Sequence, residues 1–132
     1  MEIINLTQQV ERSVRVSNRG VAFVMYPVSD MARAVEFYRD VLGLEQAGLK
    51  SDFWVEFDAG GVTFGIGNFE QTGTPGTAQS LALEVPDMAA ARDALAGKGH
   101  ESTEPFETQI CFISMVRDPD GNQIWLHQSK PA

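Results

Sequence analysis

The sequence contains a single cysteine, Cys111, among its 132 residues. A disulfide within the chain is therefore impossible, and nothing points to an oxidising compartment. Basic residues are also few: 10 Lys and Arg stand against 18 Asp and Glu, which gives a formal net charge of −8. Because an acidic surface repels phosphate backbones, we expect no nucleic-acid partner. The acidity either keeps the protein soluble or attracts a cationic ligand.

Long apolar runs are absent as well. No stretch approaches the ~20 residues that span a bilayer. Residues 1–5 lack the basic region and the apolar stretch of a signal peptide. We therefore predict a cytoplasmic protein without a membrane partner, and the length is that of one domain.

Apolar periodicity and turn residues divide the chain into elements. Residues 1–20 are polar and weakly patterned, so we interpret them as an N-terminal extension. The first half then predicts a strand at 21–26, a helix that Asp30 caps and Gly43 ends, strands at 53–58 and 62–67, and a loop at 68–77. The second half predicts a strand at 80–85, a helix that Asp87 caps and Gly97 and Gly99 end, strands at 110–116 and 123–128, and a tight turn at 118–122.

The two halves share a motif as well as an order of elements. The pattern Val28-x-Asp30-Met31-Ala32-x-Ala34 returns 57 positions later as Val85-x-Asp87-Met88-Ala89-x-Ala91. We interpret this as an internal duplication of a βαβββ unit. The predicted fold class is α+β, with two tandem βαβββ modules forming a curled mixed sheet around a cavity. The domain is expected over 21–130, with module one at 21–68, a linker at 69–78 and module two at 79–128.

Strand alternation sorts side chains between the helix-covered face and the cavity. The first set is apolar and is assigned to the core: Phe53, Val55, Phe57, Val62, Phe64, Ile66, Leu81, Leu83, Val85, Ile124 and Leu126. The second set is assigned to the cavity, as a mostly apolar small-molecule site with a few polar groups: Phe23, Met25, Trp54, Glu56, Ser80, Glu84, Trp125 and His127. Alternation leaves the first strand and the strand at 110–116 ambiguous, so Cys111 and Ser114 are unassigned.

Two segments carry a family resemblance. Residues 37–44 read FYRDVLGL and residues 118–122 read DPDGN. Together with the duplication, they resemble the vicinal oxygen chelate superfamily over roughly residues 20–130; that superfamily includes glyoxalase, bleomycin- and fosfomycin-resistance proteins and extradiol dioxygenases. The resemblance implies the fold and a homodimer. It does not imply one reaction, because a fold hosts many chemistries.

The resemblance also locates the positions at which metal-dependent members have His or Glu ligands. These positions hold Phe23, Gly65, Ser80 and Trp125 here. Phe, Gly and Trp offer no side-chain ligand, and a Ser hydroxyl is a poor one by itself. We therefore predict that the family's metal site is lost and that no cofactor is needed, with a divalent metal as the alternative.

The leading functional hypothesis is metal-independent binding or sequestration of a small apolar, aromatic or cationic ligand. The alternative is a metal-dependent or general-base lyase, isomerase or dioxygenase, with Glu56 or His127 as the base or with a site rebuilt from Glu56, Glu84 and His127. If His127 has no chemical role, we expect it to lie partly buried or at the rim of the cavity. A third hypothesis is an interaction module that uses residues 1–20.

For several residues the sequence allows both a structural and a functional interpretation. Trp54 and Trp125 either stack on a ligand or fill the cavity or a dimer contact. Cys111 is interpreted as a small buried residue rather than a nucleophile. His100, which follows Gly99, is expected on the surface.

Overall fold

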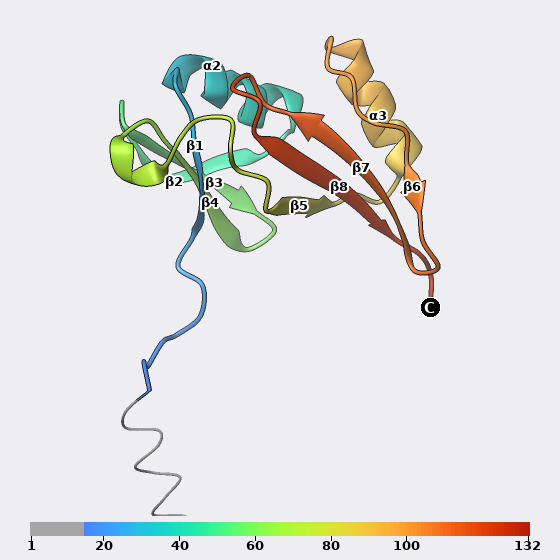
Figure 1. The fold of residues 1–132 in the computed structure, drawn as a ribbon, viewed down its shortest axis with the longest axis horizontal. Coiled ribbons are helices and arrows are strands. Elements are labelled where there is room, and N and C mark those ends of the chain that lie inside the picture. Colours follow the sequence, from blue (N-terminus) through green and yellow to red (C-terminus); the bar gives the residue numbers. More distant parts are fainter. Residues whose placement is uncertain (1–14) are drawn as a thin grey trace, which may run out of the picture.

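The computed structural model describes residues 15–132. Residues 1–14 of the predicted extension therefore lie outside the described residues, and residues 15–20 are exposed and carry no helix or strand. Residues 15–23 run away from the domain (Figure 1). No helix in the described part of the chain is long and apolar enough to cross a membrane.

The first module contains β1 (Val24–Pro27), α2 (Met31–Glu36), η1 (Phe37–Val41), β2 (Glu45–Lys50), β3 (Trp54–Ala59) and β4 (Val62–Gly67). Its strands form a four-stranded sheet in the order β1-β4-β3-β2. Strand β1 is parallel to β4, and the other pairs are antiparallel. A short 3-10 helix, η2 (Glu70–Thr72), follows in the connection to the second module.

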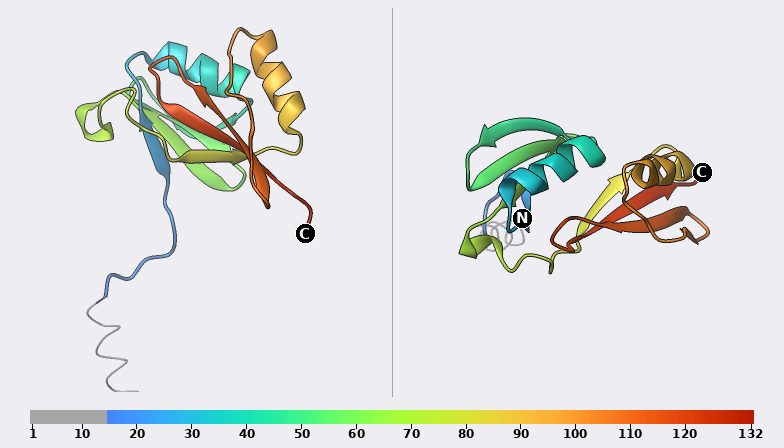
Figure 2. Two further views of the ribbon diagram at one scale, coloured as in Figure 1. Left: turned by 45° about the vertical axis from the view of Figure 1, so that its right-hand side comes forward. Right: turned by 90° about the horizontal axis from the view of Figure 1, so that it is seen from above.

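The second module repeats this plan with β5 (Leu81–Glu84), α3 (Met88–Gly97), β6 (Phe106–Glu107), β7 (Cys111–Arg117) and β8 (Gln123–Ser129). Its sheet order, β5-β8-β7-β6, matches that of the first module element by element. Figures 1 and 2 show the two sheets next to each other, with α2 and α3 on the same side of the molecule. The predicted α+β class with two βαβββ modules is confirmed, and each module forms a mixed sheet of its own.

Both predicted helix caps are confirmed. The side chain of Asp30 accepts a hydrogen bond from the backbone N–H of Arg33, and that of Asp87 accepts one from Ala90, each at 3.1 Å. These carboxylates satisfy N–H groups that have no partner within the helix. The first helix widens after Glu36 into a π-helical turn, η1, in which the N–H of Leu42 donates to the carbonyl of Phe37 at 2.9 Å.

The sequence patterns did not predict two of the strands, β2 and β6. Strand β2 is polar and mostly exposed, and its pairing with β3 shifts register between Gln46 and Lys50. Strand β6 has only two residues. Both lie at sheet edges, where neither face must be apolar and the alternation that marks a half-buried strand is lost.

The predicted core was wrong at two positions. Phe53 is 65% exposed and Val62 is 45% exposed. Phe53 lies in the bend before β3 begins, and Val62 directly follows the Gly60–Gly61 turn of the β3–β4 hairpin. Alternation describes side chains within a regular strand, so it fails at Phe53, which precedes its strand, and at Val62, which is the first residue of β4 at the hairpin turn.

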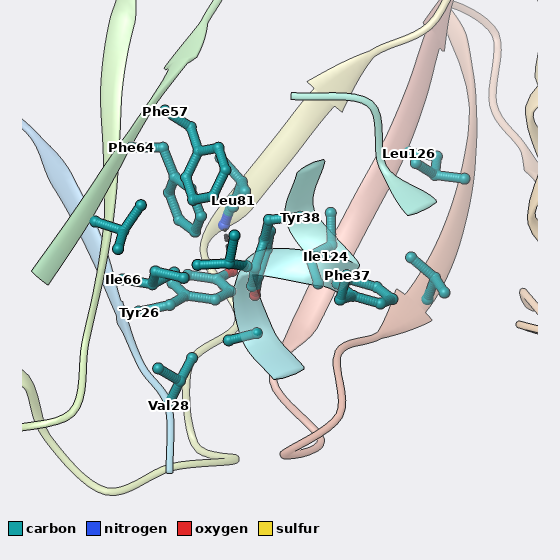
Figure 3. Packing of buried hydrophobic residues seen from close by; sticks show 14 of the residues in the cluster. Tyr26, Val28, Phe37, Tyr38, Phe57, Phe64, Ile66, Leu81, Ile124 and Leu126 are labelled. Carbon is teal, nitrogen blue, oxygen red and sulfur yellow. Dashed lines mark hydrogen bonds between the residues drawn. The ribbon is translucent and has the colours of Figure 1, made fainter. Parts of the chain in front are cut away.

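One core joins the two modules (Figure 3). It contains Tyr26, Val28, Ala34, Val35, Phe37, Tyr38, Val55, Phe57, Phe64, Ile66, Leu81, Met88, Leu95, Val116, Ile124 and Leu126. The Tyr26 hydroxyl donates to the carbonyl of Gln123 and accepts from the N–H of Leu81, both at 2.7 Å. The first strand of module one is thereby tied to β5, an edge strand of module two, and to its neighbour β8.

The segment 118–122 is the tight turn that the sequence predicts, and it also holds the modules together. Asn122 is fully buried, and its Nδ2 donates to the carbonyl of Pro27 at 2.7 Å and to Oδ2 of Asp118 at 2.8 Å. Its Oδ1 accepts from the N–H groups of Gly76 at 2.9 Å and Ala78 at 3.1 Å. One amide therefore connects β1, the linker and the β7–β8 turn.

Candidate ligand-binding faces

The open face of module one is covered by a tryptophan. Trp54 leans across β4, and a Cβ atom placed on Gly65 would lie only 2.2 Å from its Cζ2 atom. Only glycine leaves room for the indole at this position. The ring of Phe23 makes an edge contact with that of Trp54 at 5.1 Å between centroids, and the ring of Phe69 lies 6.2 Å from it.

Glu56 is fixed on the same face. Its Oε2 accepts from Nε1 of Trp54 at 2.9 Å, and its Oε1 accepts from the N–H of Leu49 at 3.1 Å. Gly48, with φ of +96°, brings the bulged backbone of β2 against the carboxylate. Both oxygens of Glu56 thus have partners, and the carboxylate holds the indole in place.

The open face of module two has a groove beside its tryptophan. The groove has a volume of about 450 Å³ and is lined by Thr103, Glu104, Phe106, Ile113, Ser114, Met115 and Trp125. Cross-strand register explains the lining, because Phe106 lies opposite Ile113 and Met115 lies opposite Trp125. Residues directly opposite in a sheet project to the same side.

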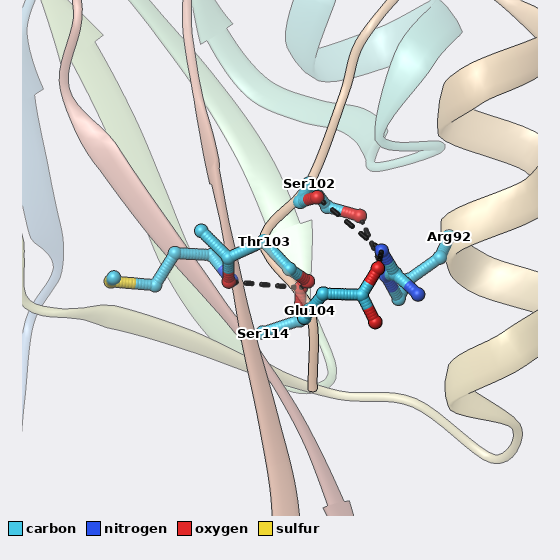
Figure 4. A network of polar contacts seen from close by, with 6 residues as sticks. Arg92, Ser102, Thr103, Glu104 and Ser114 are labelled. Atoms are coloured by element: carbon cyan, nitrogen blue, oxygen red, sulfur yellow. Dashed lines mark hydrogen bonds and ion pairs between the residues drawn. The ribbon is translucent and has the colours of Figure 1, made fainter. Parts of the chain in front are cut away.

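One wall of the groove is an irregular segment fastened to β7 (Figure 4). The hydroxyl of Ser114 donates to the carbonyl of Thr103 at 2.6 Å, and the N–H of Met115 donates to the Thr103 hydroxyl at 3.0 Å. Arg92 of α3 donates to the Ser102 hydroxyl at 3.1 Å and lies 3.6 Å from the Glu104 carboxylate. These contacts hold the wall in register with the sheet and with α3.

A histidine and a glutamate form a pair next to the groove. Nδ1 of His127 lies 2.6 Å from Oε1 of Glu84, and the N–H of Ser129 donates to Oε2 of Glu84 at 2.8 Å. The Ser129 N–H, and then His127, hold the pKa of Glu84 below its usual value. Glu84 therefore stays ionised beside the imidazole at neutral pH.

The structure divides the predicted site residues between the two faces. Phe23, Met25, Trp54 and Glu56 belong to module one, whereas Glu84, Trp125 and His127 belong to module two. Ser80 is exposed immediately before β5. Glu56 and the Glu84–His127 pair thus lie on different sheets, and residues 15–132 contain no group of three His, Cys, Asp or Glu side chains placed to hold a metal ion.

The four family ligand positions do not fit a metal ion. Phe23 and Gly65 are on module one, and Ser80 and Trp125 are associated with module two. Their donor set is a single hydroxyl, and the Trp54 indole occupies the space in front of Gly65. A divalent cation requires several oxygen, nitrogen or sulfur ligands, which these residues do not provide.

Four residues near the faces were not singled out from the sequence. Phe69 flanks Trp54, while Phe106, Ile113 and Met115 line the groove. Ile113 and Met115 alternate with the buried Ser114, but equal apolarity on both sides of β7 hid this pattern. No sequence signal marks Phe106 or Phe69, which are brought there by a two-residue strand and a loop.

Two further residues, Cys111 and His100, were singled out from the sequence. Cys111 is buried, as predicted, with its Sγ 3.1 Å from the Thr108 hydroxyl. His100, expected on the surface, is partly exposed there. It is half-buried, and its ring contacts Phe37 at 5.1 Å, because the chain turns back over η1 after α3.

The chain and its fold have known relatives. The family model described as Glyoxalase/Bleomycin resistance protein/Dioxygenase superfamily matches residues 20–126. A curated relative from Vibrio parahaemolyticus, named "Probable lactoylglutathione lyase", is 28% identical over 89% of this chain and 96% of its own length.

Two solved structures from Streptomyces sp. CB03234 are similar. TnmS3, described as an antibiotic binding protein, superposes with a TM-score of 0.78 and 25% identity over 88% of this chain and 100% of its own. A glyoxalase/bleomycin resistance protein gives a TM-score of 0.70 and 28% identity over 83% of this chain and 100% of its own. The duplicated modules, the sheet order and the family match lead to one conclusion: this chain belongs to the Glyoxalase/Bleomycin resistance protein/Dioxygenase superfamily.

Proposed function

We propose that the protein binds a small apolar or aromatic molecule, including a cationic aromatic, without the metal that the superfamily commonly uses. The observation that carries the proposal is the groove of about 450 Å³ beside Trp125. Trp125 stands at a position where the resemblance places a metal ligand. An indole there offers a flat apolar surface and a cation–π face instead of a ligand atom.

Charge and composition favour the same ligand class. The formal net charge is −8, so the surface potential attracts cations and neutral molecules more than anions. Ile113, Met115 and Phe106 supply the apolar contacts, and Thr103 and Glu104 supply polar groups at the wall. A mostly apolar pocket with a few polar groups is typical of small-molecule sites. One similar structure, TnmS3, is described as an antibiotic binding protein.

The proposal extends to a homodimer. The open face of module one exposes Phe23 (45%) and Met25 (39%) around Trp54 in a single chain. Exposed apolar residues gathered on one face are characteristic of a contact surface. A second copy would cover this face.

Ligand binding is tested by a thermal-shift and fluorescence screen of aromatic and cationic compounds against four proteins: wild type, Trp125→Ala, Ile113→Ser and Phe53→Ala. Phe53 is a matched control because it is an exposed aromatic outside the groove. We expect hits whose affinity falls at least about tenfold in the two groove variants and stays unchanged in Phe53→Ala. Equal affinity for all four proteins would contradict the assignment of the groove.

The metal-free part of the proposal has its own test. Elemental analysis of untagged protein grown with added Fe, Mn, Ni, Zn and Co should find less than stoichiometric metal. A near-stoichiometric metal would contradict it.

The Glu84–His127 contact favours one second candidate, a general-base lyase or isomerase. Of the two predicted bases, His127 fits better than Glu56, because both oxygens of Glu56 already accept hydrogen bonds. The lyase named among the relatives gives a substrate class to assay first. If wild type turns over the substrate and His127→Gln does not, this candidate is established. If His127→Gln turns over the substrate as fast as wild type, His127 is not the base and this candidate is removed.

A further inference from the structure

A single row of side chains crosses all four strands of the second sheet. Phe106 on β6 lies opposite Ile113 on β7, Ile113 lies opposite His127 on β8, and His127 lies opposite Glu84 on β5. Directly opposite residues are separated by about 4.5–5.5 Å between Cβ atoms and share a face. The row therefore begins with two residues of the groove lining and ends with the hydrogen-bonded pair of His127 and Glu84.

His127 is next to two residues that line the groove. Its cross-strand neighbour Ile113 lines the groove, and Trp125, two positions earlier on β8, lines it as well. The His127 side chain is 34% exposed, so a molecule lying on Trp125 and Ile113 can reach its ring. Within residues 15–132, no hydrogen bond other than that from Nδ1 to Glu84 is found for this ring.

The glutamate determines which ring nitrogen is left free to accept a proton. A carboxylate only accepts hydrogen bonds, so Nδ1 carries the hydrogen towards Glu84 at 2.6 Å. In a neutral imidazole the other nitrogen, Nε2, then has a free lone pair and acts as an acceptor. The Ser129 N–H fixes the second carboxylate oxygen at 2.8 Å, so the orientation of the pair is set from both ends.

We propose that His127, oriented by Glu84, is a proton-accepting group that selects ligands carrying a weakly acidic hydroxyl, such as a phenol or an enol, on an apolar or aromatic body. This inference rests on the proposed function, because it requires a ligand in the groove. When the proton transfers, the ligand O–H bond breaks, an N–H bond forms at Nε2, and the oxygen keeps the electron pair. The resulting imidazolium lies between the ligand oxyanion and the Glu84 carboxylate.

The surrounding charges argue for a neutral hydroxyl rather than a carboxylic acid. Glu84 lies opposite His127, Glu104 lines the groove beside Arg92, and the whole chain is acidic. A carboxylic acid is ionised at neutral pH, so it has no proton to give and is repelled on approach. A phenol arrives uncharged and acquires charge only where the imidazolium neutralises it.

Two probes with the same nitrophenyl body test the inference, 4-nitrophenol and its methyl ether 4-nitroanisole. Only the first has an acidic proton, and its phenolate absorbs at longer wavelength than the phenol. At a pH below the pKa of the free phenol, we expect wild type to bind 4-nitrophenol about tenfold more tightly than 4-nitroanisole. The bound spectrum should show the phenolate band.

The variants assign the effect to the pair. His127→Gln should bind both probes equally and without the phenolate band, and Glu84→Gln should weaken the preference. Glu107→Gln is a matched control because Glu107 is an exposed glutamate of the same sheet that pairs with Lys130. It should behave as wild type. If His127→Gln fails to fold, the wild-type spectrum alone still decides, since the absence of the phenolate band overturns the inference.

The failures are distinguishable. If wild type binds both probes equally and Trp125→Ala binds neither, the role of His127 is overturned and the proposed function still stands. A preference for 4-nitrophenol that persists in His127→Gln would overturn it too. Binding of neither probe would count against the groove as a site for aromatic ligands, and so against both proposals.

Discussion

Replacing Asn122 by alanine tests the claim that one buried amide holds the modules together. The Asn122 side chain donates to the Pro27 carbonyl and to Asp118, and it accepts from Gly76 and Ala78, with all four distances between 2.7 and 3.1 Å. The substitution removes all four hydrogen bonds at a residue that has no exposed surface.

The expected cost follows from these contacts. A neutral hydrogen bond contributes about 0.5–1.5 kcal/mol, and one to a charged group about 1.5–3 kcal/mol. The bond to Asp118 belongs to the second class, and the buried carbonyl of Pro27 is left without this donor. Water can reach the partly buried N–H groups of Gly76 and Ala78, which lowers the total. We expect Asn122→Ala to reduce the free energy of unfolding by about 3–5 kcal/mol.

Equilibrium unfolding in urea measures this change, with Asn68→Ala as the control. Asn68 is exposed, and its Nδ2 makes a single hydrogen bond, to the carbonyl of Asp52 at 2.9 Å. The control should lose less than about 1 kcal/mol. If Asn122→Ala also lost less than about 1 kcal/mol, the amide would not be a major link between the modules, and the reasoning would be refuted.

Four further outcomes are expected. Tyr38→Phe should lower the free energy of unfolding by about 1.5–3 kcal/mol, because the Tyr38 hydroxyl donates to the buried Asp118 carboxylate at 2.7 Å. Burial, and then the Asp118 charge, raise the pKa of the Tyr38 phenol. Above about pH 10 this phenol therefore ionises in the unfolded chain but not in the folded one, so wild type should lose stability as the pH rises. In urea titrations Tyr38→Phe should lose less stability over the same pH range. Gly65→Ala should displace the Trp54 indole and change the near-ultraviolet circular dichroism, because the new Cβ would lie 2.2 Å from the ring; an unchanged spectrum would contradict this contact. Cys111 is 5% exposed, so Ellman's reagent should modify it at least about tenfold more slowly in native protein than in urea.

Local signals predicted a large part of the fold. Asp30 and Asp87 each precede an apolar pattern of helical period, and a cap needs only its own side chain and the next three residues. The turn at 118–122 carries Pro and Gly for the same local reason. Strands β2 and β6 were missed because edge strands need no apolar face, and Phe53 was misplaced because its strand begins one residue later.

The candidate site was also predicted only in part from local sequence signals. The sequence indicated Trp54, Glu56, Trp125 and His127 as cavity-side residues, and the structure places all four on open sheet faces. Their partners are set by register between strands that are distant in the chain. Glu84, for example, meets His127 only because β5 pairs with β8. Pattern within one strand gives the face of a residue but not its neighbour across the sheet.

The sequence by itself determined the duplicated βαβββ plan, the helix caps, the turn and the absence of imidazole and carboxylate groups at the family's ligand positions. These features depend on residue identity and on spacings of a few residues. The tertiary structure decided that the modules form two sheets around one core, that Trp54 covers Gly65, and that Phe106, Ile113, His127 and Glu84 stand in one row. Those contacts join residues that are distant in the chain, 43 positions apart for Glu84 and His127 and 97 for Tyr26 and Gln123, and packing rather than local propensity selects them.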